Sequence, residues 1–128
     1  MILTTPIIIP ITLYKGDDFD LQLNWRVHCG APFDLTDYNA KMTFWPSKTD
    51  RSAPVYQITN PWTLGEGINL NDTSPNIWAH ILGVNVDFST APAVSKWHIL
   101  ELQTPAGINL GIDGVWFRFA EGKVDYIV

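Results

Sequence analysis

The sequence predicts an all-β protein, an antiparallel β-sandwich of about seven to nine strands in a single domain over residues 1–128. Nine glycines and nine prolines are spread along the chain, and short runs rich in β-branched and aromatic residues lie between them. No window combines a helical period with caps at both ends, so we expect no crossover helices. Strand candidates follow one another at about eight to twelve residues, a spacing that favours antiparallel pairing.

The chain is expected to open with an extended N-terminal arm, residues 1–6, followed by a strand over residues 8–14. Pro10 lies within that strand. Because proline has no N–H to donate to a sheet ladder, we expect the strand to lie at a sheet edge or to contain a bulge. The residues at 15–17 predict a turn.

Strict alternation over residues 18–27 is the clearest strand signal in the chain. Every second residue there is apolar and the residues between them are polar, which predicts a strand with one buried and one solvated face. A helix would place the apolar side chains on different sides, so the helical alternative fails. The side chains expected to be buried are Phe19, Leu21, Leu23, Trp25 and Val27.

A third strand is expected near residues 38–45, where every second side chain from Tyr38 to Phe44 shares a face and Pro46 ends the strand. Residues 84–92 are ambiguous and could form a helical turn. The remaining strands are expected over residues 55–59, 67–70, 76–82, 96–103, 115–120 and 123–128.

Composition and charge exclude several classes of function. The 8 basic and 13 acidic residues give a net charge of −5, whereas a nucleic-acid binder needs a basic face to neutralise phosphates. Charged residues make up only 16% of the chain, which indicates a surface that is unusually uncharged or partly covered by a partner. The longest apolar run, residues 6–13, is too short to span a bilayer and lacks signal-peptide flanks. We therefore expect no membrane contact and synthesis in a cytoplasm.

The histidines and the cysteine show no metal-binding pattern. His28, His80, His98 and Cys29 lack the short, regular spacings of a zinc site. We expect His98 to be a half-buried packing residue, because it shares a strand face with apolar neighbours. A single cysteine cannot form an intramolecular disulfide.

No catalytic or cofactor-binding motif is found, so we expect a non-enzymatic protein without a cofactor or a metal. Asp17, Asp18 and Asp20 crowd one turn, but a calcium loop would need a closing glutamate, so a solvated strand start is the stronger interpretation. The chain has no Gly-x-Ser-x-Gly elbow and no Gly-rich phosphate loop. A glycosidase pair of carboxylates stays open, because its spacing is set in three dimensions.

Six tryptophans in 128 residues point to an interaction surface. Trp25 belongs to the apolar face of its strand, but the other five are not clearly inward. The late strands also carry large apolar groups on both faces, and a two-layer sandwich covers only one of them. Contact with a protein is favoured over stacking on a sugar, because aromatic residues with little charge are typical of interface cores. The candidate interaction residues are Ile7, Ile8, Ile9, Trp45, Trp62, Trp78, Trp97 and Trp116.

Four short motifs occur in order along nearly the whole chain. They are Lys15-Gly16-Asp17-Asp18-Phe19, Phe33-Asp34-Leu35-Thr36-Asp37-Tyr38 followed by Ala40, Lys41 and Met42, Leu100-Glu101-Leu102-Gln103-Thr104-Pro105-Ala106-Gly107, and Phe119-Ala120-Glu121-Gly122-Lys123-Val124. In this order they resemble a group of small bacteriophage and prophage virion proteins related to the N-terminal domain of upper baseplate proteins. The chain departs from the family pattern at Asp37, where glycine is common.

The resemblance implies an immunoglobulin-like β-sandwich that acts as a structural joint in a virion tail, baseplate or fibre attachment. It also implies a location in the virion, other virion proteins as partners, and multiple copies or a homo-oligomer on a symmetric particle. The arm at Ile7–Ile9 could then add as a strand to a neighbour's sheet. Two alternatives are a carbohydrate-binding module, which predicts two or three coplanar exposed tryptophans, and a capsid decoration protein of the same fold.

Overall fold

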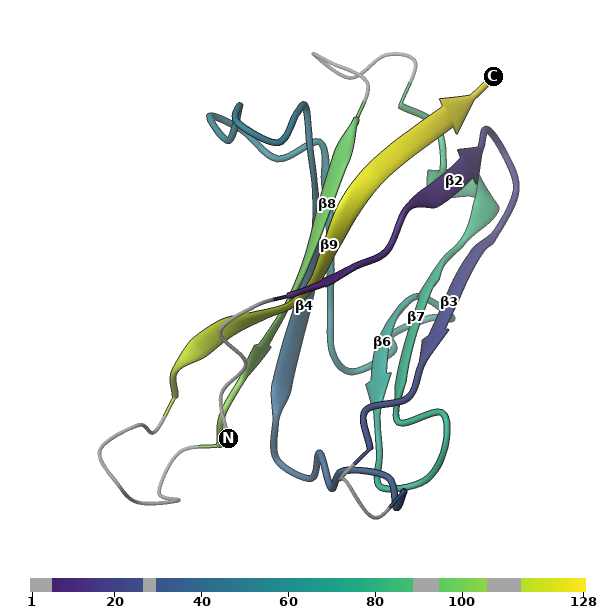
Figure 1. Ribbon diagram of the computed structural model, residues 1–128. Coiled ribbons are helices and arrows are strands. Elements are labelled where there is room, and N and C mark those ends of the chain that lie inside the picture. Colours follow the sequence, from purple (N-terminus) through teal and green to yellow (C-terminus); the bar gives the residue numbers. More distant parts are fainter. Residues whose placement is uncertain (1–5, 27–29, 89–94, 106–113) are drawn as a thin grey trace.

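The computed structural model describes residues 6–26, 30–88, 95–105 and 114–128. These residues form nine strands and one 3₁₀ turn, arranged as two sheets that pack face to face (Figure 1). The all-β class and the sandwich-like arrangement are therefore confirmed. Val27, His28 and Cys29 lie outside the described residues.

The larger sheet has six strands, in the order β1-β9-β8-β4-β5 with β2 also paired to β9, and the smaller sheet has the order β3-β7-β6. The strands of the larger sheet are β1 (Ile7–Ile8), β2 (Ile11–Tyr14), β4 (Asn39–Trp45), β5 (Tyr56–Thr59), β8 (Trp97–Gln103) and β9 (Trp116–Ile127). Those of the smaller sheet are β3 (Phe19–Leu23), β6 (Gly67–Leu70) and β7 (Ile77–Ile81).

The N-terminal strands correct the expectation of purely antiparallel sheets. Both β1 and β2 run parallel to β9, with Ile7 opposite Ala120 and Ile11 opposite Val124. A parallel pair needs a long connection, and here the rest of the domain supplies it, so no crossover helix is required. Pro10 lies between β1 and β2 and interrupts the strand predicted over residues 8–14, as its missing N–H requires.

The last strand is one continuous element, so the prediction of two strands over residues 115–120 and 123–128 is wrong. The β8–β9 ladder pairs Glu101 with Arg118 and Leu100 with Ala120, which leaves Phe119 as an extra residue on β9. Such a bulge shifts the inward-facing phase of a strand by one residue. The sequence pattern changes phase at this point, which reads as two strands although the backbone continues.

The core lies between the sheets, and its aromatic centre is Trp25. The Trp25 ring stacks on Phe33 with centroids 4.1 Å apart and also contacts Phe117 and Phe119. The buried Asn76 fixes this corner: its amide donates to the Trp25 and Phe33 carbonyls and its oxygen accepts the Trp25 N–H. The predicted alternation over residues 18–27 is confirmed as far as residue 26, although β3 itself ends at Leu23.

The ambiguous region at residues 84–92 contains one short turn of 3₁₀ helix, η1 (Gly83–Asn85). Residues 86–88 are not helical, and the rest of the predicted helical turn lies outside the described residues. Gly83 permits close packing of η1 on the first turn of the chain, because a Cβ there would lie 2.3 Å from the Gly16 carbonyl oxygen. The 15–17 turn and η1 are thus held together at one end of the smaller sheet.

Candidate functional site

The predicted interaction residues do not form one surface. Ile7 and Ile8 are exposed on β1, but their backbone pairs with β9 of the same chain, so this segment is not a free arm. Ile9 is half-buried and donates its N–H to the Glu121 carbonyl oxygen. Of the tryptophans, Trp62 and Trp116 are exposed, Trp45 and Trp78 are half-buried, and Trp97 is buried.

Aromatic side chains on the outer face of the larger sheet are covered in part by lysines. The Lys41 ammonium lies 4.4 Å from the centre of the Trp116 ring, and the Lys48 ammonium lies 5.2 Å from that of Trp97. Lysine stems commonly cover apolar surface while their charged ends stay in water. Trp97 is therefore buried although it is on the outer face, and it offers little free aromatic surface for a contact.

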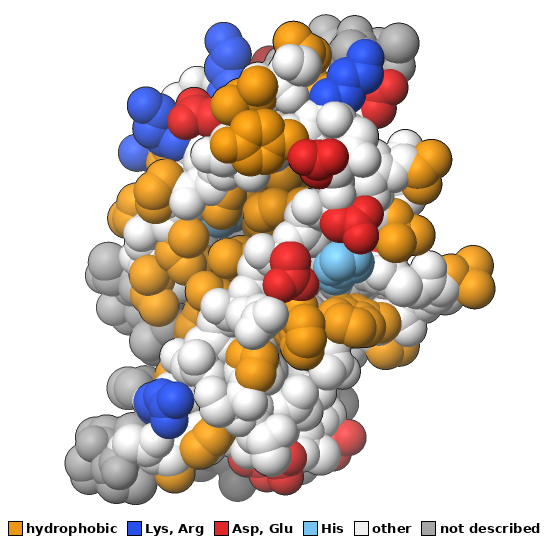
Figure 2. All heavy atoms as spheres, turned by 90° about the vertical axis from the view of Figure 1, so that its right-hand side faces the viewer, with side chains coloured by type: hydrophobic (Ala, Val, Ile, Leu, Met, Phe, Trp, Pro, Cys, Tyr) orange, Lys and Arg blue, Asp and Glu red, His pale blue; other side chains and the backbone are white. Residues whose placement is uncertain are grey.

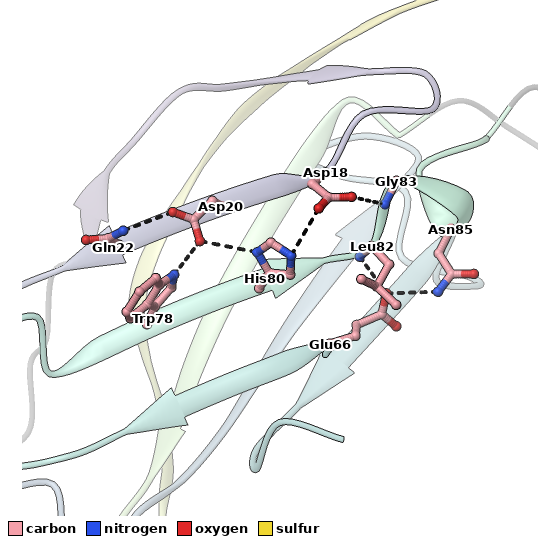
Figure 3. Close-up of polar contacts among 9 residues, drawn as sticks. All are labelled: Asp18, Asp20, Gln22, Glu66, Trp78, His80, Leu82, Gly83 and Asn85. Carbon is pink, nitrogen blue, oxygen red and sulfur yellow. Dashed lines mark hydrogen bonds and ion pairs between the residues drawn. The ribbon is translucent and has the colours of Figure 1, made fainter. Parts of the chain in front are cut away.

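The smaller sheet carries the polar cluster of the molecule on its outer face. The β3–β7 register places Asp20 opposite His80 and Gln22 opposite Trp78, and the solvated side chains of both strands meet there (Figure 3). Cross-strand neighbours of this kind lie about 5 Å apart at Cβ, so their polar ends are within reach of one another. Acidic and apolar side chains gather around a histidine in the middle of this face, and Lys and Arg lie towards its ends (Figure 2).

Two carboxylates flank the His80 ring. Its Nδ1 lies 3.3 Å from Asp20 Oδ1 and its Nε2 lies 3.6 Å from Asp18 Oδ2. Asp20 also accepts hydrogen bonds from the Trp78 indole N–H and the Gln22 amide. Partial burial alone would raise the pKa of Asp20, but these hydrogen bonds and the nearby His80 together hold it below its ordinary value. Asp18 accepts the Gly83 N–H at 2.6 Å and so connects β3 to η1.

Glu66 joins the loop before β6 to η1. One carboxylate oxygen accepts the Leu82 N–H at 3.0 Å and the Asn85 amide at 2.9 Å, and the other accepts the Tyr56 hydroxyl at 2.5 Å. Burial would raise the pKa of Glu66, but the three hydrogen bonds together with the charge of nearby His80 lower it. Burial and the same carboxylate raise the pKa of the Tyr56 hydroxyl. Glu66 therefore remains an ionised structural acceptor.

An apolar hairpin tip lies beside this cluster. Thr63 and Glu66 exchange two backbone hydrogen bonds around Leu64 and Gly65, whose φ angles of 56° and 84° are both positive, as in a type I′ turn. The Leu64 side chain is 93% exposed and that of Val84, in η1, is 82% exposed. Trp62 precedes the turn, and its indole N–H donates to the Trp78 carbonyl oxygen at 3.1 Å.

The tryptophan geometry does not favour the sugar-binding alternative. The Trp62 and Trp78 rings meet edge to face, with centroids 5.3 Å apart and an interplanar angle of 76°. A flat sugar platform needs coplanar exposed rings, and this pair provides one exposed ring standing against another. The contact instead holds Trp62 in place above β7.

The chemistry of this site is that of hydrogen-bonded surface carboxylates. They accept hydrogen bonds from backbone, indole and amide groups. Among the described residues, no group of three or more His, Cys, Asp and Glu side chains is arranged to hold a metal ion. The part of the chain that the structure describes also holds no helix of the length and hydropathy needed to cross a membrane.

Two open grooves lie away from this cluster. One, of about 550 Å³, is lined by residues of β2 and β9 together with Lys96. The other, of about 630 Å³, lies where β4 begins and β6 ends and is lined by several asparagines, including Asn39, Asn60 and Asn69. Asp125 lines the first groove, and Asp37 and Asp72 line the second.

Sequence reasoning placed Trp62 and Trp78 among the interaction candidates but missed Leu64, Glu66 and the arrangement around His80. The Leu-Gly pair of residues 64 and 65 is a weak hairpin signal, because asparagine or aspartate usually precedes the glycine of such turns. The pairing of His80 with two carboxylates depends on β3–β7 register over a separation of 60 residues. No family model and no curated protein matches the chain.

Proposed function

We propose that this chain is a non-enzymatic structural protein of a bacteriophage virion, an adaptor in the tail, baseplate or fibre attachment that joins neighbouring subunits. The virion assignment depends on the four ordered motifs that resemble the upper baseplate protein family. The features of the folded chain support the adaptor part of the proposal. Its partners are other virion proteins, and it acts in multiple copies on a symmetric particle.

The sandwich is proposed to be immunoglobulin-like. The order β3-β7-β6 corresponds to strands B, E and D of such domains, and the order β9-β8-β4-β5 corresponds to G, F, C and an added C′ strand. The chain crosses between the two sheets at the same places as in such domains, from β3 to β4, from β5 to β6 and from β7 to β8. The domain lacks the paired cysteines of antibody domains, since its sequence holds a single cysteine.

The departure at Asp37 fits the proposed family. Asp37 has a φ angle of 66°, in the left-handed region, at the turn that leads into β4. Glycine adopts this conformation without strain, and aspartate and asparagine tolerate it better than other residues. The backbone at this position therefore explains both the glycine that is common in the family and the aspartate that replaces it here.

The observation that carries the adaptor proposal is the exposure of Leu64 and Val84 on turns that are firmly tied to the domain. Exposed apolar side chains on a rigid base are typical of protein-binding surfaces. The carboxylates around them are engaged in hydrogen bonds that fix the turns, so their first role is structural. An adaptor needs such preformed contact points and no catalytic group.

The test is reconstitution of virions that lack the chain. The gene is deleted from the phage that encodes it, and the purified chain, whose mass in solution is measured first, is added to the resulting particles. We expect the chain to co-sediment with the particles at a fixed copy number and to restore assembly or adsorption. A chain that does not co-sediment with the particles and is retained on a glycan array would overturn the proposal.

The position of the chain on the particle is resolved by the same experiment. Electron microscopy of the reconstituted particles separates a tail or baseplate joint from a capsid decoration protein. Density at the tail end would support the proposed adaptor. Density spread over the capsid surface would replace it with the decoration role, which the same sandwich can also serve.

A further inference from the structure

We infer that one face of the smaller sheet docks a segment of a neighbouring virion protein in which an apolar side chain stands beside lysine or arginine. This acidic–apolar face consists of Trp62, Leu64, Val84, Asp18 and Asp20. The inference rests on the proposed function and specifies the chemistry of the partner. It is carried by backbone strain, by rigidity and by charge.

Leucine is an unfavourable residue for the turn position that Leu64 occupies. A left-handed φ is unfavourable for a residue with a Cβ, and turns of this type usually use asparagine or glycine instead. Leu64 has a φ of 56° and is 93% exposed, so its side chain gains almost no burial in return. Strain of this kind at an exposed apolar residue indicates a binding role.

The apolar side chains are held on a prearranged base. Glu66 connects the hairpin tip to η1 through the Leu82 N–H and the Asn85 amide, so the turns that carry Leu64 and Val84 are fixed relative to each other. Trp62 is fixed by its hydrogen bond to β7. Fixing the binding geometry in advance lowers the entropy lost on association, which is how rigid loops gain affinity.

The charge of this face selects the partner. Within the described part of the chain, Asp18 and Asp20 contact the His80 ring, at 3.6 and 3.3 Å, and pair with no lysine or arginine. Both carboxylates are partly exposed, so their field reaches an approaching molecule. A segment with lysine or arginine beside its apolar anchor meets complementary charge here.

Other occupants fit this face less well. A second copy of the chain that docked through the same face would bring the same two carboxylates face to face, and each copy carries a net charge of −5. Nucleic acid would be repelled for the same reason. A sugar would find edge-to-face rings instead of a flat aromatic platform. A basic and apolar protein segment is the occupant that satisfies both the charge and the exposed leucine.

Site-specific photo-crosslinking on reconstituted particles tests the inference. The photoreactive residue p-benzoylphenylalanine replaces Leu64 in one variant and Ile8, exposed on the larger sheet, in a comparison variant. Both variants are incorporated into particles, irradiated, digested and analysed by mass spectrometry. We expect position 64 to crosslink to a segment of another virion protein that contains lysine or arginine next to an apolar residue.

Charge is tested with the Asp18→Asn/Asp20→Asn double variant, after its circular dichroism spectrum has shown that it folds. We expect its association rate with particles that lack the chain to fall by about tenfold at low ionic strength. The difference from the wild type should become smaller at high salt. An unchanged rate and salt dependence would remove the basic partner from the inference.

The crosslinking outcomes separate the inference from the proposed function. If the chain is incorporated and position 8 crosslinks to a neighbour while position 64 does not, the adaptor function stands and the acidic–apolar face is not its docking surface. A crosslink from position 64 to an acidic segment also overturns the inference. If the chain is not incorporated into particles at all, both proposals fail.

Discussion

Two histidines in this domain occupy opposite environments, although each follows a tryptophan within two residues. His98, on β8, is fully buried, and its Nε2 lies 2.6 Å from the Ile9 carbonyl oxygen. His80, on β7, lies on the outer face of the smaller sheet between two carboxylates. The strand phase of each residue decides whether its ring is enclosed or meets solvent. The same residue type therefore serves packing in one sheet and a polar surface cluster in the other.

His98 belongs to a closed region where the N-terminal segment crosses the larger sheet. At this crossing, formed by Ile9, His98 and Gly122, backbone and ring are in direct contact. Substitutions at the crossing should change the stability of the domain. Substitutions at the acidic–apolar face should change binding and leave stability nearly unaltered.

The Gly122→Ala variant should be the most damaging. A Cβ at this position would lie 2.2 Å from the Ile9 carbonyl oxygen and 3.2 Å from the His98 ring. The N-terminal segment must then move off β9, and we expect a loss of about 3 kcal/mol in the free energy of unfolding, as for an overpacked core. Urea denaturation measures it, with the exposed Lys123→Ala change as the matched control. Equal midpoints for the two variants would show that the crossing is loose.

The His98→Gln variant tests the closed environment of the ring. Glutamine can still donate to the Ile9 carbonyl oxygen but fits the site less well, so we expect a loss of about 1–2 kcal/mol at pH 7.5. Burial lowers the pKa of His98, opposed by the Ile9 carbonyl and the charge of Glu121. Below the unfolded value of 6.5, the unfolded chain therefore binds a proton that the folded chain does not.

Stability of the wild-type protein should accordingly fall as the pH drops below 6.5, and the His98→Gln variant should show a smaller fall over the same range. Urea denaturation at several pH values between 7.5 and 5 gives both curves. The exposed Lys123→Ala variant keeps His98 and serves as the control, and it should follow the wild-type pH dependence. Parallel curves for the wild type and His98→Gln would show that the buried ring does not resist protonation.

The crossing of the N-terminal segment over the larger sheet was not predicted from the sequence, whereas the class of the fold was. Alternation along residues 18–26 and the run of turn residues predicted the all-β sandwich, because strand period and turn chemistry are local properties. Parallel pairing of the N-terminal strands with β9 was not predicted, since it joins the two ends of the domain. The bulge at Phe119 was not predicted either, because only the partner strand reveals the extra residue.

The candidate site was predicted only in part, for a related reason. Trp62 and Trp78 stood out by residue type alone, and both lie at or beside the acidic–apolar face. Trp97 was assigned to the surface from its strand phase, and its burial under Lys48 depends on a loop that phase does not describe. Nothing in the sequence distinguishes Leu64 from other leucines, and only its φ angle and its exposure in the folded chain mark it out.

The Asp20→Asn variant tests the acidic–apolar face, where a smaller effect on stability is expected. Asp20 is partly exposed, so replacing its charge should lower the free energy of unfolding by about 0.5 kcal/mol at pH 7. Its lowered pKa means that the stabilising contribution is present above pH 3.8 and is lost as the pH falls through the folded value. The difference from the wild type should therefore disappear in strong acid. Persistence of the difference there would mean that the amide disturbs the Trp78 contact instead.

The Leu64→Asn variant should change stability least and should change it in the favourable direction. Asparagine relieves the left-handed strain at the hairpin tip, and the leucine is too exposed for its removal to open a cavity, so we expect a gain of about 0.5 kcal/mol. If the acidic–apolar face binds a neighbouring virion protein, the same change should weaken binding to particles that lack the chain by about tenfold. Thermal unfolding and co-sedimentation measure the two effects on one sample. The exposed Val128→Asn change, outside this face, should alter neither quantity. A variant at position 64 that gains stability and binds as well as the wild type would show that the strained leucine has no part in docking.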